Sequence, residues 1–493
     1  MFYTRGSSED FDRFAEVTGD EGWNWDNLLP YFLKVRTSIL LMTKFVHSRL
    51  FQSEKWVPPA DNHNTTGEFN PKFHNTKGMV GVSLPGFKQS LDDKVIAAGQ
   101  QLGDIFEFNE DQNDGNNLGL TWNTATIDRS NRSSSAVAYL SPPAASRSNL
   151  HVLLNARVSR VLSENGDRSF RSVEYVQDLN GPFFYANATK ELILSTGVFG
   201  TPQILLNSGI GNGSYLESIG IKPLVDLPSV GQNLTDHPST GSSWYVNSSL
   251  TWDSLNRNQT AMDEAFEEWA TQQAGPLVDT IGNHLVFFRL NESTLEEVGS
   301  DPSPGPNSPH LELIIANGLF NPNPPPTGNF MSILINLLSV ESRGSFILND
   351  TDRSPFASPI IDPQFLHAEF DRIALREGIR TAFRFINAPA FDGYVLGFGG
   401  DLLNGTLTDE LIDKYISLNT ATGHHPIGTA SMSPKNSGWG VVDPDLRVKG
   451  TTGLRIVDAS ILPYLTSGHP MSAIYAIAER AADLIKADAS CAW

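Results

Sequence analysis

A short apolar strand followed by a glycine turn and a helix occurs twice in this chain, and this pattern limits the fold more than any other feature. Residues 190–195 (KELILS) are predicted to form a strand that runs through a Thr-Gly turn into a helix over 202–206. Residues 454–458 (LRIVD) form a second apolar strand, and a helix with an apolar stripe follows over 474–484. A strand, a turn and a helix in this order are one unit of a nucleotide-binding α/β sheet.

The remaining periodicity predicts a mixed α and β protein. Residues 8–33 are expected to form helix, in which Ser8 is a candidate cap and the aromatic residues supply an apolar face. Further strands are predicted over residues 151–162, 172–178, 310–315 and 331–340. No internal repeat and no low-complexity run interrupts the chain.

Length and charge exclude several classes of function. A chain of 493 residues can bury a large core and form two domains. The net charge of −20 argues against nucleic acid and against anionic membranes as partners. No apolar stretch of about 18 residues occurs, so no transmembrane helix is expected. Cys491 is the only cysteine, which excludes an intrachain disulfide, and we expect no metal site.

Glycosylation signals favour secretion. Asn-x-Ser/Thr sequons occur at Asn64, Asn131, Asn187, Asn212, Asn233, Asn247, Asn258, Asn291, Asn349 and Asn404. This number exceeds what the composition leads one to expect by chance, so we predict an extracellular protein. The start of the chain (MFYTRG) does not have the pattern of a signal peptide, and we therefore expect the sequence to be truncated at its N-terminus.

Several longer motifs resemble those of the glucose–methanol–choline oxidoreductases. They are YTRGSSEDFDRFAEVTGDEGWNWDNLLPYF (3–32), STGVFGTPQILLNSGIG (195–211), VGQNLTDH (230–237), SRGSFIL (342–348), HPIGTASM (425–432), GVVDPDLRVKGTTGLRIVDASILP (440–463) and GHPMSAIYAIAERAADLI (468–485). Their order makes the resemblance specific, and it covers nearly the whole chain. PPADNHNTTGEF (58–69) and TASMSPKNSGWGVVDPDL (429–446) are most similar to fungal aryl-alcohol oxidases within that family.

The resemblance implies a pair of histidines that handle the substrate proton. Oxidation of an alcohol removes a proton from oxygen and a hydride from carbon, and histidine is the base whose pKa best suits the first step. The resemblance makes His425 this base, makes His469 the partner of the substrate hydroxyl, and makes FAD the hydride acceptor. The two histidines are 44 residues apart in the sequence, so only the fold can bring them together. The alternative is that one is an ordinary helix cap and the other an ordinary loop residue.

The resemblance also implies which residues contact FAD. Asp458 and Ala459 end a strand, Pro470 and Met471 begin the last helix, and Val158 lies on the strand that would meet the adenine end. The helix that begins at Pro470 would direct its N-terminus at the flavin ring, where its dipole favours the negative charge of a reduced flavin. The alternative for these apolar segments is plain core packing.

Phe320 and His424 are the predicted residues of the substrate pocket. Phe320 matches an aromatic gate of aryl-alcohol oxidases, and an aromatic wall suits a benzylic alcohol. His424 stands where these oxidases usually have phenylalanine. This histidine makes the pocket compatible with a more polar alcohol as well. Asn233 and His237 belong to a family motif, and we interpret them as structural.

The chain has no glycine-rich phosphate cradle of the kind that the family uses. Gly-x-Gly sequences begin at Gly209, Gly211, Gly397 and Gly438, and none of them has the third glycine of Gly-x-Gly-x-x-Gly. We expect the first βαβ unit, with its ribose-binding acid, to be missing. Without backbone N–H groups around the pyrophosphate, we predict that this chain binds FAD weakly or not at all.

Residues 35–52 (VRTSILLMTKFVHSRLFQ) interrupt the family-like sequence. Joining Lys34 directly to Ser53 restores a continuous match. The codons for Lys-Val-Arg can contain a 5′ splice site and those for Phe-Gln can end in a 3′ splice site, so we interpret the segment as a retained intron. A real surface loop with a short helix is the alternative.

These observations predict an α/β protein with mixed α+β character. We expect a nucleotide-type FAD-binding part over residues 1–240, an antiparallel-sheet substrate domain over 241–435, and a return to the FAD-binding part over 436–493. The predicted reaction converts a primary aryl or allylic alcohol into the aldehyde and reduces O2 to H2O2. A sugar oxidase, a quinone-dependent dehydrogenase and an inactive, cofactor-free glycoprotein are the alternatives. We expect a monomer whose partners are the small-molecule alcohol and O2 or a quinone.

Overall fold

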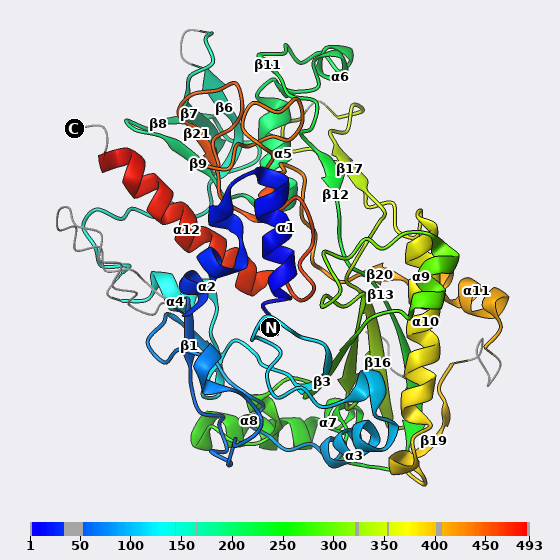
Figure 1. The fold of residues 1–493 in the computed structure, drawn as a ribbon. Coiled ribbons are helices and arrows are strands. Elements are labelled where there is room, and N and C mark those ends of the chain that lie inside the picture. The colour runs from blue at the N-terminus through cyan, green and yellow to red at the C-terminus, as the bar shows by residue number, and fades with distance from the viewer. Residues whose placement is uncertain are drawn as a thin grey trace.

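The computed structural model describes residues 2–33, 53–142, 144–163, 166–320, 325–352, 354–400 and 407–490. The predicted insert at 35–52, together with Asn404 and Cys491, lies outside these ranges. Figure 1 shows a long antiparallel sheet in one half of the molecule and shorter sheets in the other half, with the two helices of the N-terminus and the last helix between them.

The long sheet contains seven strands. Its order is β19–β13–β16–β15–β14–β3, with β20 also paired to β13, and all its pairs are antiparallel. The strands are β3 (Gly119–Trp122), β13 (Pro238–Val246), β14 (His284–Phe288), β15 (Leu311–Ala316), β16 (Phe330–Leu337), β19 (Val395–Phe398) and β20 (Ala421–Thr422). β14 and β15 are buried at every position, so both faces of the sheet are covered there. The strands predicted over 310–315 and 331–340 are thus central strands of this sheet.

Helix α10 (Glu369–Ile386) covers one face of the long sheet (Figure 1). It packs on β15 and β16, and its buried face includes Phe370, Ala374 and Ile379. Other helices are α3 (Asp92–Leu102), α7 (Trp252–Arg257), α8 (Gln259–Gln272), α9 (Glu292–Val298) and α11 (Asp409–Asn419).

The two strand–turn–helix units predicted from the sequence form adjacent parallel strands. β9 (Leu192–Leu194) pairs in parallel with β21 (Leu454–Ile456), and α5 (Gly197–Asn207) follows β9. The last helix, α12 (Met471–Ser490), crosses the molecule beside α2 (Figure 1). Within the described ranges β9 pairs with β21 alone, so its other edge has no neighbouring strand.

Small sheets and short helices surround this pair. β6 (Arg157–Ser163), β7 (Phe170–Val176) and β8 (Phe184–Asn187) form a three-stranded antiparallel sheet, and β12 (Gln232–Leu234), β17 (Gly344–Ile347) and β18 (Ile360–Asp362) form another. Two-stranded pairs and short helices complete the set: β1 (Glu54–Trp56) with β2 (Val80–Val82), β4 (Ile127–Asp128) with β5 (Asn131–Arg132), β10 (Ile210–Gly211) with β11 (Val225–Asp226), α4 (Ser135–Leu140) and α6 (Gly213–Ser218).

The strand predicted over 151–162 forms only from Arg157 onward. Val152, Leu153 and Leu154 lie outside any strand, and they are 58%, 58% and 71% exposed. A strand needs a hydrogen-bonded neighbour, and the described residues provide one for β6 but none for this apolar segment. The prediction for residues 151–156 is therefore wrong in this chain.

The helix predicted over 8–33 is divided into α1 (Ser8–Thr18) and α2 (Trp25–Leu33) by a 3-10 turn at Glu21–Trp23. Gly19 ends α1 with φ +68°, a left-handed conformation that glycine adopts without the steric cost of a side chain. The turn residues overrule the apolar periodicity, which continues through the break.

Ser7, rather than the predicted Ser8, caps α1. The Ser7 hydroxyl accepts a hydrogen bond from the Asp10 N–H, and the Asp10 carboxylate accepts one from the Ser7 N–H. Asp10 also accepts from the N–H of Ser467 at 2.7 Å, so the same cap holds a turn that is distant in the sequence.

None of the described helices combines the length and the apolar character that crossing a lipid bilayer requires.

Candidate active site

His469 lies in the turn that leads into α12. Its backbone N–H donates to the Thr4 hydroxyl at 2.6 Å, and its Nε2 lies 3.1 Å from Oε1 of Glu312. Pro470 follows, buried, directly before the first helical residue, Met471, which is half-buried. Proline suits this position because the first turn of a helix leaves its N–H groups without helical partners.

His425 lies in a loop that pairs with the end of β12. The N–H of Ile427 donates to the Thr235 carbonyl, and the N–H of His425 donates to Oδ1 of Asp236 at 2.8 Å. The preceding residue, His424, is exposed and has φ +62°, which costs energy for a residue with a side chain. Its N–H is held by the Thr422 hydroxyl. The loop conformation thus presents His425 inward and His424 to solvent.

The fold brings the two predicted proton-handling histidines together. The ring centroids of His425 and His469 are 4.5 Å apart, and the rings meet edge to face at 81°. Phe2 packs edge-on against the other side of His469, at 5.0 Å between centroids. These contacts fix the position of the His469 ring beside His425.

His237, interpreted as structural from the sequence, contacts His425. The two Nδ1 atoms are 3.0 Å apart, and His237 is completely buried. A hydrogen bond between them requires one N–H and one lone pair, which two neutral imidazoles can provide. Asn233, from the same motif, has the expected structural contacts: its amide donates to the Ser431 hydroxyl and the Pro463 carbonyl.

Glu312 was missed by the sequence analysis. It lies on β15, is fully buried, and holds His469 Nε2 with one carboxylate oxygen while the other accepts from the Asn336 amide at 2.8 Å. The available signal was an acidic residue inside the apolar strand LELIIA, because a buried carboxylate needs a specific partner.

Burial keeps two of the three histidines neutral. It lowers the pKa of His425 far below the ordinary imidazole value, with a further contribution from the neighbouring His469, His237 and His424. Burial and the proximity of His469 likewise lower the pKa of His237 to about 3. His425 therefore has a ring nitrogen with a free lone pair, which is the form a base requires.

The predicted cofactor residues Asp458 and Ala459 lie where β21 ends. Oδ2 of Asp458 accepts from the Gly197 N–H at 3.0 Å and from the Thr201 hydroxyl at 2.6 Å, and Oδ1 accepts from the Ser460 N–H. Asp458 thus ties the start of α5 to β21, and both its oxygens have protein partners. The Ala459 side chain is partly buried against the main core.

Val158 and Phe320 lie apart from the histidines. Val158, on β6, is partly buried against the core. Phe320 is 62% exposed, and its N–H donates to the Ser332 hydroxyl. No contact between described residues joins either side chain to the histidine pair, and their roles in binding FAD and substrate stay predictions.

The residues present suit one end of FAD. The first turn of the 20-residue helix α12 directs backbone N–H groups toward the histidine pair, and such groups favour the negative charge of a reduced flavin ring. Pro470 and Met471 lie at this helix start, and their contact with the ring stays a prediction. The pyrophosphate lacks a matching cradle, because no Gly-x-Gly in the chain continues to a third glycine. The donor set therefore fits the reactive ring and does not fit the phosphates.

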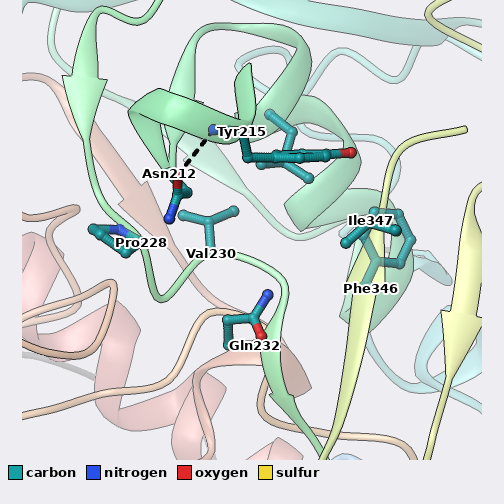
Figure 2. Close-up of a pocket in the computed structure, with 8 residues that line it drawn as sticks. Asn212, Tyr215, Pro228, Val230, Gln232, Phe346 and Ile347 are labelled. Carbon is teal, nitrogen blue, oxygen red and sulfur yellow. Dashed lines mark hydrogen bonds between the residues drawn. The ribbon is translucent and has the colours of Figure 1, made fainter. Parts of the chain in front are cut away.

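A hollow of about 400 Å³ is lined by none of these histidines (Figure 2). Asn212 and Tyr215 of the α6 region, the loop with Val230, and Phe346 of β17 surround it. Tyr215 is its only ionisable side chain, so the hollow lacks the acid–base groups that the proposed chemistry needs.

Comparisons with known proteins agree with these features. Family models described as GMC oxidoreductase match residues 1–239 and 340–478. The chain is 38% identical to dehydrogenase eriK of Hericium erinaceus, over 99% of this chain and 79% of that protein. It is 39% identical to pyranose dehydrogenase 3 of Leucoagaricus meleagris, over 98% of this chain and 78% of that protein.

Solved structures show the same fold. A variant of the formate oxidase of Aspergillus oryzae superposes with a TM-score of 0.85 at 26% identity, covering 100% of this chain and 83% of that one. A fungal aryl-alcohol oxidase superposes with a TM-score of 0.82 at 26% identity, covering 98% and 84%. The chain therefore belongs to the GMC oxidoreductases, a family of FAD-binding flavoproteins, and is an oxidoreductase that acts on CH–OH donors.

Proposed function

We propose that this protein oxidises a small-molecule alcohol to the carbonyl compound, with His425 as the base that removes the hydroxyl proton. One observation carries the proposal. The ring of His425 is buried and neutral, and its centroid lies 4.5 Å from the ring centroid of His469, which directly precedes α12. FAD, when bound, accepts the hydride that leaves the substrate carbon.

The neighbouring side chains assign the protons in the site. With the Nδ1–H of His425 donated to Nδ1 of His237, the lone pair of His425 lies on Nε2, which accepts the substrate proton. Glu312 holds the Nε2 edge of His469 at 3.1 Å, and we propose that the Nδ1 edge of the same ring faces the substrate hydroxyl. His237 and Glu312 are thus positioning residues, each fixing one catalytic ring.

Two substrate classes are proposed. Primary aryl or allylic alcohols, oxidised with O2 to give H2O2, are supported by the motifs at 58–69 and 429–446 and by the structural similarity to a fungal aryl-alcohol oxidase. Sugars, oxidised with a quinone, are supported by the exposed, polar His424 next to the base and by the identity to pyranose dehydrogenases.

Steady-state assays with excess FAD separate the two classes. Veratryl alcohol and glucose serve as donors, and O2 and benzoquinone as acceptors. Turnover of veratryl alcohol with O2 supports the first class, and turnover of glucose with benzoquinone supports the second.

Replacement of the base tests the proposal itself. Because general-base catalysis contributes roughly 10²–10⁴-fold, His425→Ala is expected to lower kcat by that factor. His63→Ala is the control, since His63 lies on an exposed loop between Asp61 and Glu68. Equal kcat values for His425→Ala and the unmodified chain would remove His425 from the reaction.

We also propose that the protein is secreted, glycosylated and monomeric. Seven sequon asparagines lie on the surface: Asn64, Asn131, Asn187, Asn212, Asn247, Asn258 and Asn291. Asn233 is expected to stay unmodified, because both hydrogen bonds of its amide nitrogen are made inside the protein. Peptide mass mapping of the natural protein checks this, and a glycan on Asn233, or no glycan at any of the seven surface sites, would contradict it.

A further inference from the structure

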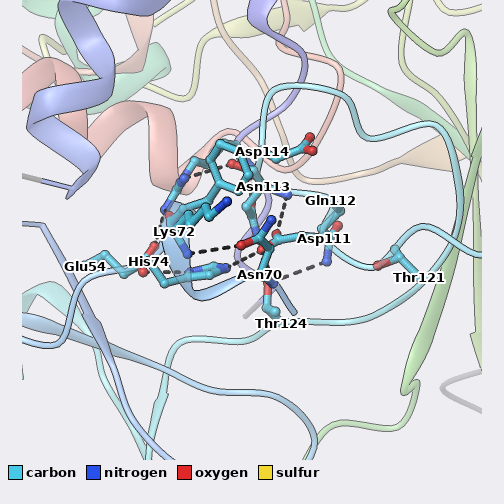
Figure 3. Close-up of polar contacts among 12 residues, drawn as sticks. Glu54, Asn70, Lys72, His74, Asp111, Gln112, Asn113, Asp114, Thr121 and Thr124 are labelled. Carbon is cyan, nitrogen blue, oxygen red and sulfur yellow. Dashed lines mark hydrogen bonds and ion pairs between the residues drawn. The ribbon is translucent and has the colours of Figure 1, made fainter. Parts of the chain in front are cut away.

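A second group of charged side chains is buried outside the histidine pair (Figure 3). Arg5, Glu54, His74 and Asp111 come from four separate segments, and their side chains are 0%, 0%, 2% and 4% exposed. We call these four residues the charged clasp. Buried charges are costly unless each is paired, so the protonation state of every member matters.

His74 is the centre of the clasp. Its Nδ1 lies 2.8 Å from Oε1 of Glu54 and its Nε2 lies 2.9 Å from Oδ2 of Asp111. A neutral imidazole has a single N–H and can donate to one of these oxygens only. Trp56 lies over the ring at 3.9 Å between centroids, a contact that favours a cation. The geometry thus requires an imidazolium between two carboxylates.

Glu54 is held in the ionised form, and Asp111 is held by backbone N–H groups. Glu54 Oε2 accepts from Arg5 at 2.5 Å, and burial, which alone raises the pKa of Glu54, is outweighed by Arg5 and His74, which lower it to about 2. Asp111 accepts from the backbone N–H groups of Asn70 and Asn113, both at 2.9 Å. With an imidazolium the four charges cancel, whereas a neutral His74 leaves one negative charge uncompensated.

Two further titratable groups lie beside the clasp. Tyr3 lies next to Arg5 and Glu54, and burial raises the pKa of its phenol. Asp114 lies beyond Asp111, and burial raises the pKa of its carboxyl. Neither supplies a positive charge. His74 is therefore the member of the clasp whose protonation decides whether the four charges cancel.

The clasp is linked to His469 through the sequence neighbours Arg5 and Thr4. The Arg5 N–H donates to Asn113 Oδ1 at 2.9 Å, and its guanidinium also donates to the Phe73 carbonyl at 2.7 Å. The next residue back, Thr4, accepts the N–H of His469. The chain from residue 2 to residue 6 thus runs between the clasp and the turn before α12.

We propose that His74 is a positioning residue for the reaction, because its imidazolium locks Arg5 in place and so fixes Thr4 under the backbone of His469. This inference rests on the proposed role of His469.

The pH dependence of the clasp follows from its charges. Burial lowers the pKa of His74, but Glu54 and Asp111 outweigh burial and raise it above the ordinary imidazole value. A histidine whose pKa is raised by folding stabilises the fold fully below its unfolded pKa, and this stabilisation is lost as pH rises through the folded pKa. We expect the hydrogen bond from the His469 N–H to the Thr4 hydroxyl to weaken over the same pH range.

Histidine NMR on the full chain tests the coupling without FAD or turnover. The chain is labelled with ¹³C at the histidine Cε1 positions, and the signals of His74 and His469 are assigned from His74→Gln and His469→Gln. We expect the His74 signal to titrate above the ordinary imidazole pKa, and the His469 signal to shift at the same midpoint. In His74→Gln this shift of the His469 signal should disappear.

Two variants make the result decisive. His63→Gln removes a histidine that also lies between two carboxylates, but on the surface, and it should leave the His469 shift intact. Thr4→Val removes the hydroxyl link, and it should abolish the His469 shift while His74 titrates as before. It answers the question even where His74→Gln does not fold.

A His74 signal that titrates at or below the ordinary imidazole pKa, or a His469 signal that does not respond at the His74 midpoint, overturns the proposal. Failure of the alcohol assays alone leaves this result unaffected, so the two proposals fail separately.

Discussion

His425 suits a base because of what surrounds its ring, not because it is a histidine. Burial and three neighbouring histidines keep it neutral, and its Nδ1 lies 3.0 Å from Nδ1 of His237, so one of these two rings donates to the other. The Nε2 atom of His469, in contrast, faces a carboxylate oxygen of Glu312.

Glu312→Gln tests the importance of that carboxylate. Glutamine keeps the size of the side chain but loses the charge. Charge-assisted hydrogen bonds contribute about 1.5–3 kcal/mol, so kcat/KM is expected to fall about ten- to hundredfold. Steady-state kinetics across pH, with excess FAD, measures this loss and any change in the pH profile. Glu217→Gln, an exposed residue of α6, is the control. An unchanged kcat/KM and pH profile would exclude Glu312 from the site.

At the scale of elements, α10 positions β15 and β16, and β15 carries Glu312. The helix approaches the sheet closely at Gly378. A Cβ there would lie 2.5 Å from Cγ2 of Ile335 and 3.1 Å from Cδ2 of Leu311, closer than packed carbons tolerate. Because glycine has no side chain at this position, α10 can pack this closely against the long sheet.

Gly378→Ala is therefore expected to destabilise the fold although it improves helix propensity. Alanine gains about 1 kcal/mol over glycine inside a helix, and overpacking a core costs typically about 1–3 kcal/mol. Because both neighbours are buried, we expect a net loss in the free energy of unfolding, measured by urea denaturation. The double variant Gly378→Ala with Ile335→Leu, whose side chain has no Cγ2 methyl, should recover part of the loss. A single variant that is more stable than the unmodified chain would show that Ile335 and Leu311 can move aside without a cost in free energy.

At the scale of the whole molecule, the two ends of the FAD site are unequal. The proposed ring end has the histidine pair and the start of α12, whereas one edge of β9 has no partner strand among the described residues, and Ile193 on β9 is 40% exposed. Leu153 and Leu154 are also exposed in a segment that forms no strand. The described residues therefore offer FAD a reactive site without a phosphate cradle.

We predict that this chain holds FAD weakly. Without backbone N–H groups around the pyrophosphate, the cofactor loses the contacts that a glycine-rich turn and helix N-terminus provide. After incubation with excess FAD and gel filtration, the flavin absorption band is expected to be absent from the protein peak, while the mixture before filtration shows it. A yellow protein peak would contradict the prediction.

Local sequence was enough to predict the elements whose signals are local. The β9–α5 unit, β21 and α12 follow from apolar runs, glycine turns and helical spacing, and the motifs at 425–432 and 468–485 name the family. The same kind of signal failed at residues 151–156, because a strand depends on a hydrogen-bonded partner that the local sequence does not specify.

Only the tertiary structure placed the residues that complete the site. Glu312 is 157 positions from His469 and His237 is 188 positions from His425, and no spacing rule links them. Their contacts depend on the register of the long sheet and on the pairing of two loops, which in turn depend on packing across the whole core. These side chains are brought into contact only by the folded chain. The chemistry of the site therefore depends on distances that the tertiary structure sets.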